Sequence, residues 1–524
     1  MNTFELITAL MAAVIVLVWL AERIQVPYPM LLTIGGLALA VMPWTPNIEL
    51  EPEIVLVIFL PPVLFQAAQQ TSFRDFQANF TAISRLAVGL VLVTTAAVAV
   101  VAHWVIPGIS WAAAFVLGAV VSPPDAVAAT AIFQRPGAPR RIVTILEGES
   151  LINDASAIVV YTFAVAAVVT GVFSPVDALL EFVIVIVIGI TVGAVLGHVL
   201  GSILSLLGDP SLVAITTLIA PAGAYVLAER LGGSGVLAVV MAGLVHSHHS
   251  SHTMSPAARI RSLPIWDVTM VLVNGFIFIL IGFELGALRH QLSPQDLWAV
   301  IGDALAVLAA MAAARFVYVF AGNQFTRRNR KRQAADQLDT RSQFLIAWSG
   351  LRGVVSLATA LALPMVTQDG SPFDHRQEII LITAAVIVFT LFGFGLPLPW
   401  ILRKLKLGDD GMYEREMELA REVVQKTMYD QFRIALEENP DLKESFGPIL
   451  KEMQDRYARI RSAKQTKTSD EIAEILKPRA AVRQRAIAAA REALLELRDR
   501  REIGDEVQRE MERQLDLQEI QLTV

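Results

Sequence analysis

The chain has no cysteine among its 524 residues, so disulfides, thiol catalysis and cysteine-ligated zinc are excluded. Charged residues make up only 18% of it, and no long basic block stands out. Nucleic-acid binding is therefore not expected. The glycine-rich stretch Gly232–Gly235 follows no predicted strand, which argues against a phosphate-binding loop. The sequence indicates no cofactor.

Apolar residues are abundant: 54% of the chain is hydrophobic and the mean hydropathy is +0.55. Runs of about 20 apolar residues, enough to span a lipid bilayer, recur through the first 402 residues. The first run contains Glu5 and has no basic segment before it, unlike a cleaved signal peptide. We predict an all-α polytopic membrane protein with about thirteen transmembrane helices, at residues 3–20, 28–43, 53–70, 86–105, 110–133, 142–170, 177–206, 210–228, 233–247, 266–286, 296–321, 342–366 and 377–402.

Residues 403–524 have a different composition from the rest. They hold 24 of the 43 Lys and Arg and 26 of the 49 Asp and Glu. We therefore predict a transmembrane domain over residues 1–402 and a helical cytosolic domain over residues 403–524. An apolar stripe with a spacing of four residues, from Ile503 to Leu515, fits a helix bundle that packs on itself. A dimer contact or a regulatory module is the alternative for this tail.

Basic residues in the loops predict the orientation. Arg135, Arg140 and Arg141 follow the fifth span and a cluster at 327–332 follows the eleventh, whereas the loops after even-numbered spans hold few. Loops rich in Lys and Arg stay in the cytoplasm. We expect a plasma-membrane protein with its N-terminus outside and its tail in the cytoplasm.

Two of the predicted spans look broken. The fifth contains Ser122-Pro123-Pro124-Asp125, and proline removes a backbone donor and clashes with the preceding turn. The twelfth contains Gly350-Leu351-Arg352-Gly353, a charge between two glycines. Spans five and twelve are an odd number apart, so they run in opposite directions. This predicts two inverted repeats, whose paired broken helices point to a transporter binding site.

Asp125 follows the prolines of the first break. An unwound helix frees backbone carbonyls, such as that of Pro124, and a carboxylate beside loose carbonyls suits an alkali cation. We therefore assign Asp125 and the Pro124 carbonyl to ion binding. The alternative is that Asp125 only caps the second half-helix.

Asp154 lies in the next span, one helical turn after Ser150, so the two side chains share a helix face. Charged groups inside a membrane are costly and therefore usually functional. We expect a proton and a cation to compete for Asp154, with Ser150 as an additional ligand. The alternative is a polar patch that holds helices together.

Arg315 lies in the middle of a span and cannot lose its charge, so it needs a buried anion. Glu149 is our predicted partner, with Glu284 as the alternative. Arg352 is expected to satisfy carbonyls of the second break or to restrain Asp125. His246, His248, His249 and His252 cluster in a serine-rich segment that we expect to be a solvated loop, although a metal site or pH sensor is conceivable.

Four stretches in separate spans form a recognisable set: Phe59 to Phe65, Asp125 to Ala128 with Ala131 to Phe133, Gly148 to Asp154, and Gly350 to Gly353. Together they resemble the cation:proton antiporter-1 family, the sodium/proton exchangers. The resemblance covers roughly residues 5–402, and the order of its motifs in separate spans makes it specific.

The resemblance implies an antiporter, not an enzyme, that exchanges Na⁺ for H⁺ as a homodimer. It implies that Asp125, Asp154, Ser150 and the Pro124 carbonyl bind the ion and that Glu149 pairs with Arg315. Asn153 before Asp154 is typical of the electroneutral branch, in which an amide replaces a second Asp.

The sequence departs from the family pattern in two ways. Pro124 and Ala126 flank Asp125, where the family has a Thr or similar residue before and a proline after. Gln66 stands where an acidic residue is common. Both departures bear on ion preference, so K⁺/H⁺ exchange is a second interpretation and Li⁺ a further possible substrate.

Two rival classes of protein also fit parts of the pattern. An intramembrane aspartyl protease needs two membrane aspartates, but neither Asp125 nor Asp154 has the Tyr-Asp or Gly-x-Gly-Asp context of those enzymes. A channel or sensor in which the tail gates the pore is the third interpretation. A channel can only dissipate an ion gradient, so steady exchange against a gradient would argue against it.

Overall fold

The computed structural model describes residues 3–24, 26–41, 58–71, 73–125, 139–171, 175–289, 294–328 and 338–405, with Leu407, Ile434 and Glu437. The chain separates into two compact units, Met1–Asp409 and Asp410–Val524. Apart from Ile434 and Glu437, the predicted tail helices lie outside the described residues, and the domain boundary at residue 402 stays a prediction.

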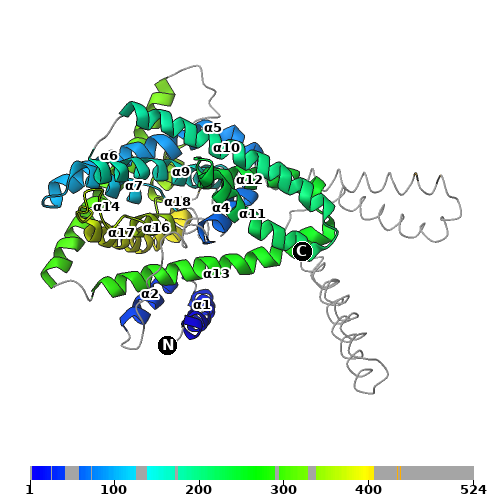
Figure 1. Cartoon of the computed structure of the whole chain (residues 1–524), viewed down its shortest axis with the longest axis horizontal. Helices are drawn as coiled ribbons and strands as arrows, with labels where there is room; N and C mark the ends of the chain where they lie inside the picture. Colours follow the sequence, from blue (N-terminus) through cyan, green and yellow to red (C-terminus); the bar gives the residue numbers. More distant parts are fainter. Residues whose placement is uncertain are drawn as a thin grey trace. The chain divides into compact units, whose positions relative to one another are not determined.

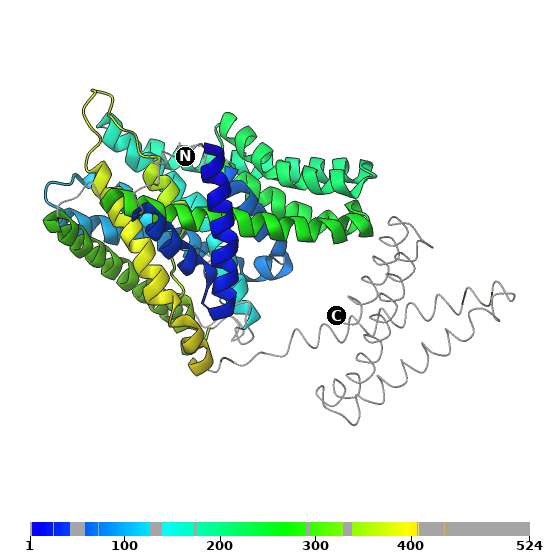
Figure 2. The same ribbon diagram turned by 90° about the horizontal axis from the view of Figure 1, so that it is seen from below.

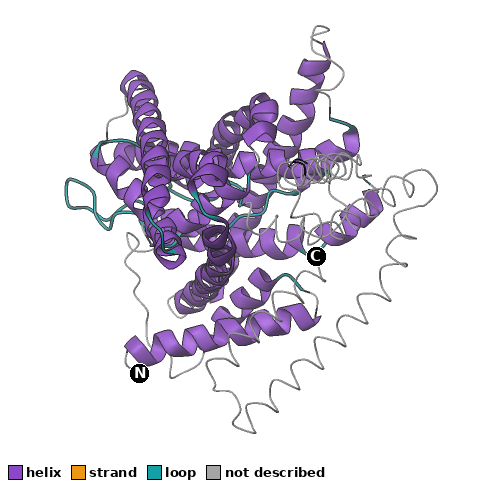
Figure 3. Ribbon diagram, turned by 90° about the vertical axis from the view of Figure 1, so that its right-hand side faces the viewer, coloured by secondary structure: helices purple, strands orange, loops and turns teal. Residues whose placement is uncertain are grey.

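The described part of the first unit is helical, and no strand is drawn in it (Figure 3). Figure 1 shows how the helices are arranged. They are, in chain order, α1 (Thr3–Ile24), α2 (Tyr28–Val41), α4 (Leu60–Gln70), α5 (Phe73–Ser84), η1 (Arg85–Leu90), α6 (Val91–Val105), α7 (Trp111–Val121), α9 (Arg140–Thr170), α10 (Pro175–Leu206), α11 (Pro210–Arg230), α12 (Gly235–Thr253), α13 (Pro256–Arg289), α14 (Pro294–Arg328), α15 (Thr340–Trp348), α16 (Val354–Leu361), α17 (Arg376–Thr390), η3 (Leu391–Gly395) and α18 (Leu398–Leu405).

Within the described residues, seven helical stretches have the length and hydropathy needed to cross a bilayer. They are Arg74–Val105, Arg141–Thr170, Leu180–Leu206, Pro210–Arg230, Ala258–Gly282, Leu297–Gly322 and Arg376–Leu405. The last of these, which joins α17, η3 and α18, is the long yellow rod of Figure 2. The polytopic all-α membrane fold is thus confirmed, while the number of thirteen spans stays a prediction.

The helix ends follow local chemistry. Ser110 accepts a hydrogen bond from the Ala113 N–H and starts α7, and Asp339 accepts one from the Ser342 N–H and starts α15. The long helix α9 ends at Gly171, whose φ of 70° is the left-handed conformation that glycine adopts without strain.

Both broken spans are interrupted where the sequence predicts. Helix α7 stops at Val121, before Ser122 and the two prolines, and residues 122–125 are not helical. Residues 126–138, which follow, lie outside the described part. In the second break, α15 ends at Trp348 and α16 begins at Val354, after Gly353.

The histidine-rich segment is a correction to the sequence analysis. Helix α12 continues to Thr253, so His246, His248 and His249 lie on a helix and not in a loop. His246 is buried and stacks on Phe65 of α4. The serine and histidine residues do not break the helix because the preceding turns of α12 pack against α4 and α10.

Two groups of packed helices meet around the first break. One apolar core joins α6, α7, α14, α16 and α17, and a second joins α4, α10, α11, α12 and α13. Leu151 and Ala155 of α9 belong to the second core, while Ala164 of α9 belongs to the first. Helix α9 therefore bridges the two cores and carries Glu147, Ser150 and Asp154 beside its contact with the second core.

Candidate functional site

A cavity of about 320 Å³ lies between the first break, α9 and the second core. All four predicted ion-binding residues line it: Pro124 and Asp125 of the first break, and Ser150 and Asp154 of α9. Further lining comes from α2, α4, α13 and α16. Residues from separate spans are thus brought to one space inside the helical body.

The cavity is acidic. Four carboxylates line it, from Asp125, Glu147, Asp154 and Asp267, and none of the described lining residues is basic. Asp125 and Asp154 are close enough to interact electrostatically. A cavity lined by charge of one sign between apolar walls concentrates the opposite charge, so this space attracts cations and repels anions.

The periodicity of α9 separates two sets of polar residues. Glu147, Ser150 and Asp154 recur at helical spacing and line the cavity. Glu149 and Asn153 are one turn apart on another face, are fully buried, and bond to neighbouring segments. One helix thereby supplies the polar lining of the cavity and also anchors the segments around it.

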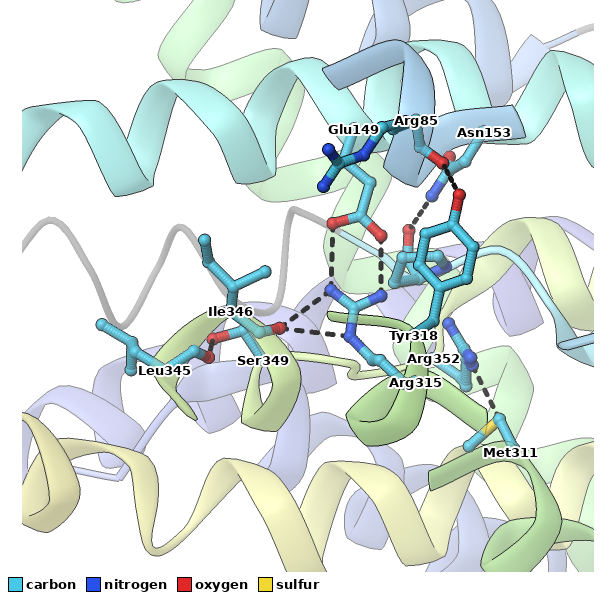
Figure 4. A network of polar contacts seen from close by, with 11 residues as sticks. Arg85, Glu149, Asn153, Met311, Arg315, Tyr318, Leu345, Ile346, Ser349 and Arg352 are labelled. Carbon is cyan, nitrogen blue, oxygen red and sulfur yellow. Dashed lines mark hydrogen bonds and ion pairs between the residues drawn. The ribbon is translucent and has the colours of Figure 1, made fainter. Parts of the chain in front are cut away.

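Glu149 holds Arg315 of α14 in a bidentate ion pair (Figure 4). The Nη1–Oε1 and Nη2–Oε2 distances are 2.6 and 2.9 Å, and both side chains are almost fully buried. Arg315 also donates to the Ile346 carbonyl of α15, at 3.1 Å from Nε and 3.0 Å from Nη2. The pair therefore joins α9 and α14 to the half-helix before the second break.

Asn153 supports the first break. Its Nδ2 donates to the carbonyl of Pro124 at 3.0 Å (Figure 4). The carbonyl that the sequence assigns to the ion thus already accepts one hydrogen bond and has one remaining lone pair. Asn153 orients this carbonyl at the wall of the cavity.

The two breaks are joined directly. The Asp125 N–H donates to the Leu351 carbonyl at 2.7 Å. A Cβ atom on Gly353 would overlap the Asp125 carboxylate, so only glycine lets the two segments approach this closely. Thr390 of α17 supports the second break, because its Oγ1 accepts the Arg352 N–H at 3.1 Å.

The side chain of Arg352 differs from the sequence expectation. Its Nε lies 3.0 Å from the Met311 sulfur, and its Nη1 has no hydrogen-bond partner among the described residues. It therefore does not satisfy carbonyls of the break. The short Gly-flanked segment directs this side chain toward α14, where Met311 packs (Figure 4).

The sequence analysis missed several polar groups of the cavity. Tyr28 of α2 and Asn274 of α13 both line the space together with Asp267 and Ser356. The Ser356 hydroxyl is buried without a hydrogen-bond partner among the described residues. Asp267 and Asn274 lie seven residues apart on one helix face, which is a signal that the sequence did contain.

Gly353→Ala tests the contact between the breaks. The added methyl group displaces the Asp125 carboxylate, and a misplacement of about 1 Å at a reacting group costs on the order of 100-fold in rate. We expect exchange in proteoliposomes to fall by about that factor. Gly302→Ala is the control, because a Cβ there meets open space. Equal rates for the two variants would contradict the assigned role of Gly353.

A carboxylate-lined cavity at two linked helix breaks defines an ion-coupled secondary transporter. The chain matches the model of the transmembrane sodium/hydrogen exchanger family over residues 9–404, and it belongs to that family. It is therefore a membrane antiporter that exchanges cations for protons, not an enzyme.

Similar proteins carry the same description. A Mycobacterium bovis protein named as an uncharacterized Na⁺/H⁺ exchanger is 32% identical over 98% of this chain and 95% of its own. A sodium, potassium, lithium and rubidium/H⁺ antiporter of Bacillus pumilus is 32% identical over 72% of this chain and 58% of its own. The sodium/proton antiporter MjNhaP1 of Methanocaldococcus jannaschii shares the fold, with a TM-score of 0.61 at 19% identity over 78% of this chain and all of that one.

Proposed function

We propose that this chain exchanges Na⁺ for H⁺ at one site formed by Asp125, Asp154, Ser150 and the Pro124 carbonyl. The cavity that these four residues line together is the observation that carries the proposal. Oxygen ligands of this kind suit a hard alkali cation that has lost water. The exchange itself needs no metal ion other than the transported Na⁺ or K⁺.

Exchange follows from competition for the carboxylates. A cation and a proton neutralise the same negative charge, so Asp154 holds one or the other. When the site faces alternate sides of the membrane in turn, each crossing carries either a cation or protons, and net flux follows the two gradients. Glu149 takes no part in this competition, because Arg315 neutralises it within a bidentate pair.

Asn153 supports electroneutral exchange. Its amide donates to the Pro124 carbonyl, a bond that an aspartate at this position could make only when protonated. The amide therefore supplies the hydrogen bond without adding a titrating group to the site. We propose one proton per cation.

Potassium is the second candidate substrate. Gln66 lines the cavity at the position where the family often has an acid, and its neutral amide leaves one formal charge fewer beside the ion. A site with less negative charge favours K⁺, because K⁺ loses its hydration water more easily than Na⁺ does. The Bacillus pumilus relative, by its name, also transports potassium and lithium.

Pyranine fluorescence in proteoliposomes decides between the two ions. Addition of Na⁺, Li⁺ or K⁺ outside acidified vesicles should alkalinise the lumen, with Na⁺ the most effective, as cations enter and protons leave. If exchange is electroneutral, valinomycin with equal K⁺ on both sides leaves the initial rate with Na⁺ unchanged. A rate that rises severalfold under this voltage clamp would show net charge movement and refute the one-to-one ratio.

We also propose a homodimer in the plasma membrane, with the N-terminus outside and residues 403–524 in the cytoplasm. The basic loops after odd-numbered spans support this orientation. Protease should remove a C-terminal tag from inverted vesicles and spare it in intact spheroplasts. Cross-linking of the purified protein in detergent should give a species of twice the monomer mass, and a monomer alone would contradict the dimer.

A further inference from the structure

Helices α10 and α12 lie side by side (Figure 1) in unusually close contact. A Cβ on Gly189 would come within 2.7 Å of the Ser234 carbonyl oxygen, and one on Gly197 within 2.7 Å of the Val245 Cβ. Because the contacts advance in the same direction along both helices, the pair is parallel. Glycines at four-residue spacing form the ridge that permits this approach.

A pair of histidines lies near the end of this interface. His198 of α10 follows Gly197, and His249 of α12 lies one turn beyond Val245. Their ring centroids are 5.0 Å apart and the ring planes are inclined by 54°. The two histidines are 51 residues apart in the sequence, and the close packing of α10 on α12 brings their rings together.

Both rings have the same tautomer. The Nδ1 atom of His198 lies 2.8 Å from the Ala194 carbonyl oxygen, and that of His249 lies 2.9 Å from the Val245 carbonyl oxygen. A carbonyl only accepts, so Nδ1 carries the proton in each ring. In the neutral imidazole, the lone pair is then on Nε2.

This is the arrangement of metal-ligating histidines, which usually donate the other ring N–H to a carbonyl or carboxylate. Zinc binds imidazole nitrogen at about 2.0–2.1 Å in tetrahedral geometry, which places two ligating rings with their centroids about 5 Å apart. The observed separation of 5.0 Å agrees with this requirement.

The polar end of α12 admits ions from water. His249 lies in this end and is partly exposed, and Gly201 of α10, one turn after His198, lies against Thr253 at the end of α12. From His246 to Thr253, α12 consists of histidine, serine and threonine alone, which indicates a helix end outside the hydrocarbon. The described residues contain no group of three or more ligands suited to a metal, so water must complete the coordination.

We propose that His198 and His249 form a two-histidine site for a divalent transition-metal ion such as Zn²⁺ or Ni²⁺. The ion ties the ends of α10 and α12 together. Neither histidine lines the carboxylate cavity. The site is therefore separate from the exchange site and independent of the transported cation.

Titration of Zn²⁺ into the full-length protein in detergent tests this site. The protein must be purified without a polyhistidine tag. We expect the wild-type chain to bind one Zn²⁺ that His198→Gln and His249→Gln each weaken at least tenfold. The double variant should bind no more weakly than the weaker single one, because two ligands of one ion are not additive.

His103→Gln is the matched control. His103 stacks on Trp111 beside α7, and its Nδ1 also contacts a backbone carbonyl, that of Ile109. The His103→Gln variant should bind Zn²⁺ with the wild-type affinity. Wild-type Zn²⁺ affinity in either His198→Gln or His249→Gln would overturn the proposal. Unaltered cation/proton exchange in metal-free buffer shows that these variants are folded.

Thermal unfolding is a second test, which does not require the Zn²⁺ affinity to be measured. Zn²⁺ bound across two helices should raise the thermal unfolding midpoint of the wild-type protein and of His103→Gln. It should not raise that of His198→Gln or His249→Gln. An equal rise in all four proteins would place the ion elsewhere and overturn the proposal.

Discussion

Asp154→Asn is expected to abolish cation-driven proton flux while leaving membrane insertion intact. Asparagine has nearly the same shape, and it keeps one acceptor oxygen while an NH₂ donor replaces the other. It cannot bind a transported proton or neutralise a cation, so the site loses the group for which the two ions compete. Asp154 is 5% exposed and lines the cavity together with Asp125, so its charge acts directly on an ion bound there.

The measurement is the pyranine assay on proteoliposomes with equal amounts of inserted protein. Asp303→Asn is the matched control, since Asp303 also lies within a span, on α14, and does not line the cavity. We expect flux near the wild-type level for Asp303→Asn and the flux of empty liposomes for Asp154→Asn. Normal exchange by Asp154→Asn would refute the proposed mechanism.

Glu149→Gln is expected to destabilise the protein strongly. The substitution removes the charge that neutralises Arg315, which is 3% exposed and cannot lose its proton. Removing one partner of a buried ion pair costs about 3–5 kcal/mol, because the other charge remains buried. The Ile346 carbonyl still accepts from Arg315, but a carbonyl carries no neutralising charge.

Thermal unfolding in detergent, monitored by size-exclusion chromatography, measures this loss of stability. Glu181→Gln on the exposed surface of α10 is the control and should unfold at the wild-type temperature. The double variant Glu149→Gln, Arg315→Met should recover part of the loss, since it removes the isolated charge as well. If Glu149→Gln unfolds at the same temperature as Glu181→Gln, the ion pair does not stabilise the fold.

The sequence predicted the fold class because the composition of each segment shows whether that segment can span a membrane. Apolar length identifies helices such as α10 and α14 without knowledge of their neighbours. Proline and glycine, at Pro123 and Gly353, likewise predicted both helix breaks through local backbone chemistry. Asp154 stood out because a charge within an apolar run is costly wherever that run packs.

Residues whose roles depend on distant partners were harder to interpret. The sequence left both Glu149 and Glu284 open as partners of Arg315, and helix packing places Glu149 against it. It expected Arg352 to contact carbonyls of the break or to restrain Asp125. The side chain points to Met311 and not to those carbonyls, and restraint of Asp125 stays a prediction. The sequence also placed His246 in a loop, because the polar run around it hides the packing that keeps α12 helical.

By itself, the sequence determined that this protein is a helical membrane antiporter with aspartates at a broken span. Local hydropathy, prolines and the order of motifs carry that information. Only the tertiary structure decided which groups share a space: the Asp125 carboxylate on Gly353, the Asn153 amide on Pro124, and His198 beside His249. These contacts depend on how closely separate helices approach, which residue spacing within one helix does not encode.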